Sequence, residues 1–244
     1  MIFLFKRKKI VLDCFTSNIG AYEYYPIDKL KDNVPNWFRE LPNKYYQEND
    51  VSMSMPTSTI KSCPGVLEMF KSLATIRLHS DIIINTRPDG FWEYASPNQG
   101  DLDIDSHNTQ QYGVAFDDYI HLKFNMPWLI KEKLGVRFYF TQDYWNNIQY
   151  MQNMHVSSGV VNFKHQNSTN INMFLNRERN TINIEAGQPL VSLIPMSECE
   201  LVIKNHLVSE TEWEQIHKAQ VYPSKFIGKY NHRKSLGKCP FGFK

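Results

Sequence analysis

His79 and Asp81 are the two residues whose types and spacing suggest chemistry most directly. They form an H-x-D pair among apolar segments, and residues i and i+2 of a β-strand point to the same face. A histidine, a carboxylate and a second histidine, with open positions beside them, form the ligand set of a non-haem Fe(II) centre. His165 is available as the second histidine. These three residues are therefore the candidate metal ligands of the chain.

The H-x-D pair also resembles the motif of the Fe(II)/2-oxoglutarate oxygenases, which use a β-rich scaffold. Arg177 is a candidate for holding the acid co-substrate. The spacing is common, however, because eight histidines, each with roughly a one-in-eight chance of an acid two residues on, give about one such pair by accident. An Fe(II)/2-oxoglutarate oxygenase is therefore the second alternative function. The sequence predicts no bound metal and no cofactor.

Other motifs give no catalytic site. The segment 101–106 opens like a calcium-binding loop, but an EF-hand needs Gly at position six and Glu at position twelve. Those positions hold Ser106 and Tyr112, so a solvated acidic loop is expected. The chain has no nucleophile-elbow, P-loop or dinucleotide-binding motif. Its four cysteines lack the spacing of a zinc site or a disulfide framework. We predict no catalytic residue and favour a non-enzyme.

Short apolar segments separated by turn residues dominate the chain and predict strands. The expected strands are 10–15, 74–78, 81–85, 91–94, 119–124, 135–141, 159–164, 171–176, 180–184 and 189–195. Apolar spacing and capping residues predict short helices at 35–41, 64–73 and 209–219. The fold class is therefore mainly β, an antiparallel β-sandwich or barrel with a few short helices. We expect a single mainly-β domain over residues 1–208, followed by a C-terminal helix and basic tail over 209–244.

The segment 159–196 gives a more specific indication. The strand Gly159-Val160-Val161-Asn162 leads through a strand pair to the edge that contains Gly187, and this order resembles the core of the dUTPase-like β-clip fold. The resemblance places Asn162 where that family has its catalytic carboxylate. An amide has no charged proton-accepting form near neutral pH, so it cannot act as the general base. A small-molecule-binding or nucleotide-processing protein on this scaffold is the first alternative function.

Charge is unevenly distributed, although the formal net charge is only +2. Residues 1–12 hold four basic residues and the segment after Glu214 holds seven, with no acid in either, which leaves 16 basic against 25 acidic residues between them. Basic ends on an acidic body predict docking onto an acidic protein partner or self-association, and nucleic acid is the less favoured partner. The expected interaction residues are Lys6, Arg7, Lys8, Lys9, Lys225, Lys229, Arg233, Lys234, Lys238, Phe241 and Phe243.

Segments that would direct the chain to a membrane or out of the cell are not recognisable. No apolar run reaches the roughly 18 residues that a membrane helix needs. The N-terminus places its apolar residues before its basic ones, which is the reverse of a secretory signal. The sequence therefore predicts a protein that is neither secreted nor bound in a membrane.

Several motifs between residues 30 and 243 resemble a family of uncharacterised proteins from bacteria and tailed marine bacteriophages. They are V-P-N-W-F at 34–38, T-I-K-S-C-P at 59–64, F-W-E-Y at 91–94, I-H-L-K-F-N-M-P-W at 120–128 and K-C-P-F at 238–241. The resemblance implies a source and no mechanism. Together with the basic ends it predicts a non-catalytic structural or assembly protein, located in the host cytoplasm or the virion.

Overall fold

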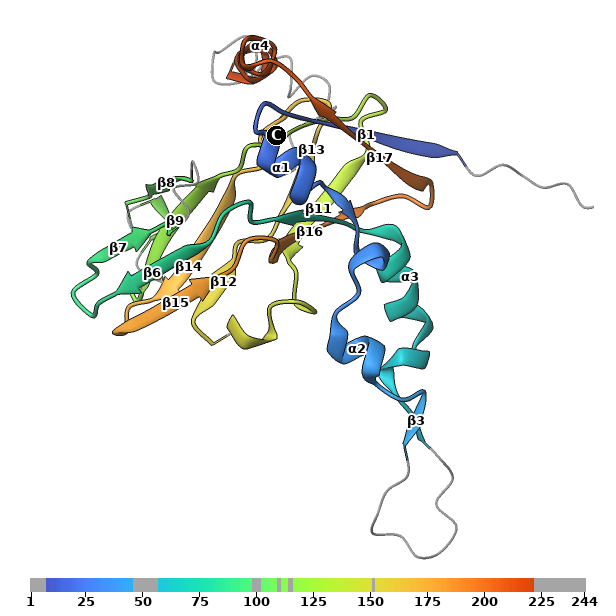
Figure 1. The fold of residues 1–244 in the computed structure, drawn as a ribbon, viewed down its shortest axis with the longest axis horizontal. Coiled ribbons are helices and arrows are strands. Elements are labelled where there is room, and N and C mark those ends of the chain that lie inside the picture. The colour runs from blue at the N-terminus through green and yellow to red at the C-terminus, as the bar shows by residue number, and fades with distance from the viewer. Residues whose placement is uncertain are drawn as a thin grey trace, which may run out of the picture.

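The structure, a computed structural model, describes residues 8–45, 57–97, 102–108, 111–113, 116–150 and 152–221. Over these residues the fold is mainly β with short helices, as the sequence predicts. Four sheets of three to five strands share one hydrophobic core. None of the sheets closes into a barrel within the described part of the chain, so the fold is sandwich-like. Figure 1 shows these sheets grouped in one body, from which a helical arm projects.

The first strand of the body pairs with the last. Strand β1 (Lys9–Thr16) lies between β10 (Leu129–Lys131) and β17 (Glu200–Leu207). β1 and β17 run parallel over their whole length, whereas all other described strand pairs are antiparallel, as predicted. β17 is not among the predicted strands, because a parallel pair needs a long connection and leaves no local turn signal.

Two further sheets are adjacent and are linked by backbone hydrogen bonds. The five-stranded sheet has the order β13 (Gly159–Asn162), β11 (Arg137–Gln142), β16 (Pro189–Pro195), β5 (Ala74–Arg77) and β2 (Asp28–Lys29). The three-stranded sheet has the order β15 (Asn180–Ile184), β6 (Ile82–Thr86) and β7 (Trp92–Ala95). Leu78 joins them, since its amide donates to Gln188 and its carbonyl accepts from Gly187, at 3.0 and 2.7 Å.

The fourth sheet contains β12 (Met154–Val156), β14 (Ile171–Asn176), β9 (Tyr119–Asn125) and β8 (Asp103–Ser106), in that order. β8 shows that the expectation of an acidic loop over 101–106 is wrong. Ile104 is buried between two exposed aspartates, which is the period-two pattern of a half-buried strand. The Asn125 side chain donates to Asp103 and Asp105, at 2.9 and 3.1 Å, and so holds the acidic face of this edge strand.

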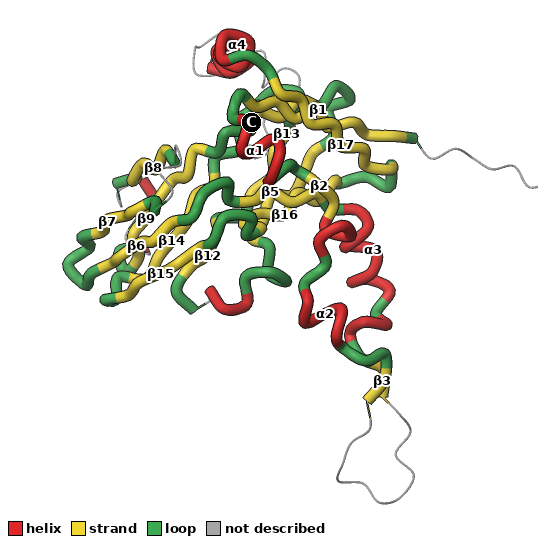
Figure 2. Tube along the Cα trace, viewed as in Figure 1, coloured by secondary structure: helices red, strands yellow, loops and turns green. Residues whose placement is uncertain are grey.

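The helical arm comprises two 3-10 turns, η1 (Leu30–Asn33) and η2 (Ile60–Ser62), the helices α2 (Asn36–Glu40) and α3 (Pro64–Ser72), and the hairpin β3 (Lys44–Tyr45) and β4 (Thr57–Ser58). Both helices were predicted. Figure 2 shows them set apart from the sheets, with β3 farther from the body. A separate small cluster of buried residues holds the arm together; its members are Leu30, Phe38, Phe70 and Leu73. Trp145 and Ile194 of the body pack against this cluster and dock the arm.

Three short helical elements complete the body: α1 (Ile19–Tyr24), η5 (Ile148–Tyr150) and α4 (Glu210–Val221). The predicted capping box of α4 is present, because the Glu212 carboxylate accepts from the Ser209 amide at 3.0 Å and the Glu212 amide donates to Ser209 Oγ at 3.3 Å. Trp213 Nε1 donates to the Pro127 carbonyl at 3.0 Å and attaches α4 to the body. Among the described helices, none has both the length and the apolar character that a membrane crossing requires.

Candidate functional site

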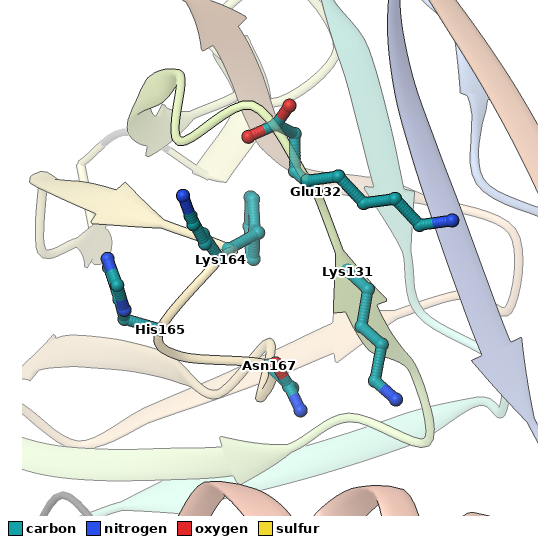
Figure 3. A pocket seen from close by; sticks show the side chains of 7 residues that line it. Lys131, Glu132, Lys164, His165 and Asn167 are labelled. Carbon is teal, nitrogen blue, oxygen red and sulfur yellow. The ribbon is translucent and has the colours of Figure 1, made fainter. Parts of the chain in front are cut away.

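A cavity of about 410 Å³ opens between the end of β10 and the loop that follows β13. Figure 3 shows Lys131 and Glu132 on one side of it and Lys164, His165 and Asn167 on the other. Three lysines contribute to its described lining, which consists of Lys131, Glu132, Lys133, Phe163, Lys164, His165 and Asn167. Lys133 and Lys164 are exposed, whereas Phe163 is buried and forms part of the apolar lining. We call this feature the cationic cavity.

Glu132, the one acid of the described lining, is only 2% exposed and is engaged by backbone groups. Its carboxylate accepts hydrogen bonds from the amides of Leu134, Gly135 and Val136, at 2.7, 2.5 and 2.9 Å. These bonds close the turn between β10 and β11, where Gly135 has a φ of 81°, a conformation that glycine adopts without strain. The Glu132 carboxylate is therefore engaged by the backbone of the turn. The three lysines give the rim of the cavity its positive charge.

Asn162 connects the two sides of the cationic cavity. Its Nδ2 donates to the Gly135 carbonyl at 3.3 Å, and its Oδ1 accepts from the Lys164 amide at 3.1 Å. The Asn167 carbonyl also accepts from the Ile130 amide at 2.7 Å. The position that the dUTPase-like resemblance assigns to a catalytic carboxylate thus holds an amide that fixes the loop.

The lysines of the cationic cavity suit it to bind anionic groups. Lys131 Nζ lies over the Phe15 ring on the neighbouring strand β1, 5.5 Å from its centre, so the ammonium group itself faces an aromatic surface. Lysines act as strongly hydrated point charges rather than as bidentate ligands. The cavity therefore suits carboxylates or phosphates of a mobile or extended partner, held by charge more than by geometry.

The candidate iron ligands are not gathered at this site. His165 lines the cationic cavity, whereas His79 and Asp81 belong to the connection between β5 and β6. Asp81 Oδ1 accepts from the Ala186 amide at 2.7 Å and so fixes the connection between β15 and β16. The Arg177 guanidinium lies beside Gly90 in the β6–β7 turn. No three His, Cys, Asp or Glu side chains of the described residues lie close enough together to hold a metal ion.

The predicted interaction residues fall mostly outside the described residues. Lys8 and Lys9 are described and exposed, and Lys9 Nζ lies 3.9 Å from the Glu200 carboxylate on β17. An exposed pair at this distance contributes about 0–1 kcal/mol. The others lie outside the described residues; they are Lys6, Arg7, Lys225, Lys229, Arg233, Lys234, Lys238, Phe241 and Phe243.

His121, a buried histidine on β9, was not among the residues that the sequence suggested as functional. His121 is 3% exposed, and its ring stacks on His107 and Phe174 with centroid distances of 4.7 and 4.8 Å, while Tyr112 meets it edge-on at 4.1 Å. Neither ring nitrogen has a hydrogen-bond partner among the described residues. Burial, and then the charge of His107, lower the pKa of His121 to about 4. The ring is therefore neutral at pH 7 and packs as an apolar group.

The cationic cavity was also missed, because Lys164 is distant in sequence from Lys131 and Lys133 and only the β10–β13 arrangement brings the three together. Comparison with protein-family models, with curated proteins and with solved structures finds no match to this chain. Both resemblances drawn from the sequence, to the bacterial and phage family and to the dUTPase-like core, therefore stay predictions.

Proposed function

We propose that this protein is a non-catalytic structural or assembly protein of a bacteriophage-like source, located in the host cytoplasm or the virion. It attaches through its basic segments to an acidic protein surface, most simply the body of a second copy. The observation that carries this proposal is the cationic cavity itself, where three lysines line the described rim and the one acid is engaged by backbone amides. The source rests on the sequence resemblance alone.

The strand register supports this proposal. β10 runs antiparallel to β1, with Leu129 opposite Phe15 and Lys131 opposite Asp13. Beyond Lys131 the chain therefore runs toward the N-terminal end of β1, which begins at Lys9. Lys131 and Lys133 therefore lie on the strand next to β1 and on the turn that follows it, and β1 is entered through the exposed residues Lys8 and Lys9. We call these four residues, together with Lys164, the positive region.

Exposed acids lie on other parts of the body. Asp103 and Asp105 alternate on the edge strand β8, and Glu210 and Glu212 lie in the first turn of α4. A contact between the positive region of one copy and an acidic region of the next joins two different surfaces. Such a head-to-tail contact builds rings or filaments, which is the behaviour of an assembly protein.

The strength of this contact depends on several groups acting together. One exposed ion pair contributes about 0.2–1 kcal/mol, so the lysines need the apolar anchors Phe241 and Phe243 of the tail to give a stable complex. Screening acts over about 10 Å at 0.1 M salt and about 3 Å at 1 M salt. Association is therefore expected to weaken steeply as the salt concentration rises.

The test is the molar mass in solution, measured by sedimentation velocity at about 0.1 M and about 1 M salt. We expect oligomers at low salt and a smaller species at high salt. Replacing Lys131, Lys133 and Lys164 together by Glu, or deleting residues 221–244, lowers the association state while the far-UV circular dichroism is unchanged.

The matched control replaces three exposed lysines elsewhere, Lys31, Lys44 and Lys71, by Glu, which makes the same change in net charge. This control is expected to keep the oligomers. A wild-type chain that is monomeric at low salt, or a control that dissociates as fully as the cavity variant, would overturn the proposal.

A further inference from the structure

A second cavity, of about 290 Å³, lies at the junction between the arm and the body and is separate from the cationic cavity. The arm contributes residues around η1 and α2, and the body contributes the end of β5, the segment that follows β11 and the segment that leads into β16. Two guanidinium groups and three amides contribute to its described lining, which contains no carboxylate. Its residues are Asn33, Val34, Pro35, Asn36, Arg39, Arg77, Asn146, Gly187 and Pro189.

From this lining we infer that the junction cavity binds an oxyanion, the carboxylate or phosphate group of a small polar molecule. A guanidinium presents a planar fork of donors that matches both kinds of group bidentately. Two such forks on opposite walls favour a ligand with more than one anionic oxygen. The site does not depend on the proposed assembly function, because the two cavities share no lining residue.

Arg77, the last residue of β5, is held in place before any ligand arrives. Its Nη2 donates to Asp28 Oδ2 at 2.8 Å, and its side chain is 13% exposed. Asp28 also accepts hydrogen bonds from Thr75 Oγ1, at 2.8 Å, and from Asn33 Nδ2. The guanidinium has five N–H donors, and its Nε is buried without a hydrogen-bond partner among the described residues. The described protein groups therefore leave donor capacity of Arg77 unused.

Arg39 comes from the other wall, on α2, and is exposed. The helix end that carries it is fixed, because Lys61 Nζ donates to the carbonyls of Arg39 and Leu41, at 2.8 and 3.1 Å. With Arg77 paired to Asp28, Arg39 gives the described lining a net positive charge. An oxyanion between the two arginines would bridge the arm and the body.

The body wall of the junction cavity is also fixed. Asn146 Nδ2 donates to Asp143 Oδ1 at 3.1 Å, and the Asn146 carbonyl accepts from Gln188 Nε2 at 2.6 Å. The neighbouring residue Trp145 stacks on Trp37 at 5.9 Å, and its carbonyl accepts from Trp37 Nε1 at 2.9 Å. Since each tryptophan is adjacent in sequence to a lining asparagine, ligand binding is expected to change the tryptophan fluorescence.

The experiment titrates the full chain with inorganic phosphate and, separately, with succinate, while fluorescence and calorimetry are recorded. Sodium chloride at matched ionic strength is the blank. We expect saturable binding of at least one probe and no saturation with chloride. Phosphate binding alone assigns a phosphate ligand, succinate binding alone assigns a carboxylate ligand, and saturation by neither probe overturns the inference.

Two variants locate the binding. Arg39→Gln removes an exposed charge without touching the core, and Arg77→Lys keeps the charge beside Asp28 but removes the fork; each is expected to weaken binding at least tenfold. Arg137→Gln, an exposed arginine on β11 outside the cavity, is the matched control and should stay within twofold of wild type. Wild-type affinity in Arg39→Gln would overturn the assignment. The lysine variant of the cationic cavity should bind the probe normally, so failure of one proposal is distinguishable from failure of the other.

Discussion

The β body and the helical arm differ sharply in how much apolar surface holds each of them. The core of the body draws buried side chains from four sheets, among them Leu12, Ile84, Leu122 and Phe138. The described part of the arm has four buried apolar residues in its cluster and depends on Trp145 and Ile194 of the body to complete it. The body is therefore stable through many contacts, whereas the arm is positioned by few.

The contacts of the arm are mostly aromatic. Phe38 meets Phe70 edge-on at 4.7 Å, Phe70 meets Trp145 edge-on at 5.8 Å, and Trp37 stacks on Trp145. Each such pair contributes about 0.5–1.5 kcal/mol beyond the burial of its area. Because so few contacts hold it, the arm is the part of the molecule that can change position. A single substitution, or a ligand in the junction cavity, can cause that change.

The largest effect is expected in the body. Phe124 on β9 is 0% exposed, and Phe124→Ala should lower the free energy of unfolding by about 3–5 kcal/mol, because a cavity is left in a closely packed core. Denaturant unfolding followed by far-UV circular dichroism measures the change. If the arm unfolded while the body kept its stability, the comparison between the two regions would be wrong.

Phe70→Ala tests the arm in the same way. We expect a loss of about 3 kcal/mol that acts on the docking of the arm, since Phe70 joins its cluster to Trp145. Hydrogen exchange should speed up over residues 30–42 and 64–73 and stay slow in the β body. Leu67→Ala, at an exposed position of the same helix, is the control. Faster exchange throughout the body would show that the two regions unfold as one.

The acid sensitivity of the body is expected to depend on His121. Its pKa is lowered from 6.5 to about 4 in the folded protein, so the unfolded chain binds the proton first as the pH falls. The free energy of unfolding should therefore drop between pH 6.5 and 4, by roughly 2–3 kcal/mol from this residue. His121→Phe, which keeps the stacking, should flatten this part of the pH profile. His155→Phe, an exposed histidine on β12, should not, and equal profiles for the wild type and His121→Phe would refute the assignment.

Gly187 gives the smallest effect and lies where the arm meets the body. Its φ is 86°, and an added Cβ would lie 3.1 Å from Tyr25 Cε1. Gly187→Ala should destabilise the protein by about 1–2 kcal/mol, the cost of a left-handed conformation for an L-residue. Gly159→Ala, where no atom lies within 4 Å of an added Cβ, is the control. Thermal unfolding compares the two variants, and equal melting temperatures would contradict the prediction.

Local patterns predicted the elements that local forces determine. A short run of isoleucines predicted the strand at 81–85, the turn residues at 87–90 predicted the hairpin that follows it, and Ser209 with Glu212 predicted the start of α4. The segment of β8 was predicted as a loop because its aspartates are polar and only one residue between them, Ile104, is buried. β17 was not predicted because Lys204, Asn205 and His206 are polar and its partner strand lies at the other end of the chain.

The candidate sites were less predictable than the strands. The H-x-D pair had suitable spacing, yet Asp81 is engaged by the Ala186 amide, and His165 lies with lysines. Both cavities are built from segments that are distant in sequence, such as Arg39 with Arg77 or Lys131 with Lys164. Spacing along a chain cannot show such pairs, since no local pattern links residues in segments so far apart.

The parallel pairing of β1 with β17 has a consequence for synthesis. Each residue of β1 pairs with the residue 191 positions later, so the β1–β17 pair cannot form until nearly all of the described chain has been made, whereas β10 pairs only with Asp13–Phe15 and is made earlier. At about 5–20 residues per second, the partner of β1 is completed roughly 10–40 s after β1 itself. During that time Ile10 and Leu12, which are buried in the folded protein and lie outside the β10 pairing, lack a partner strand. β1 is thus among the last described strands to become fully paired, and a nascent chain stalled before residue 200 would present its apolar N-terminal half to chaperones.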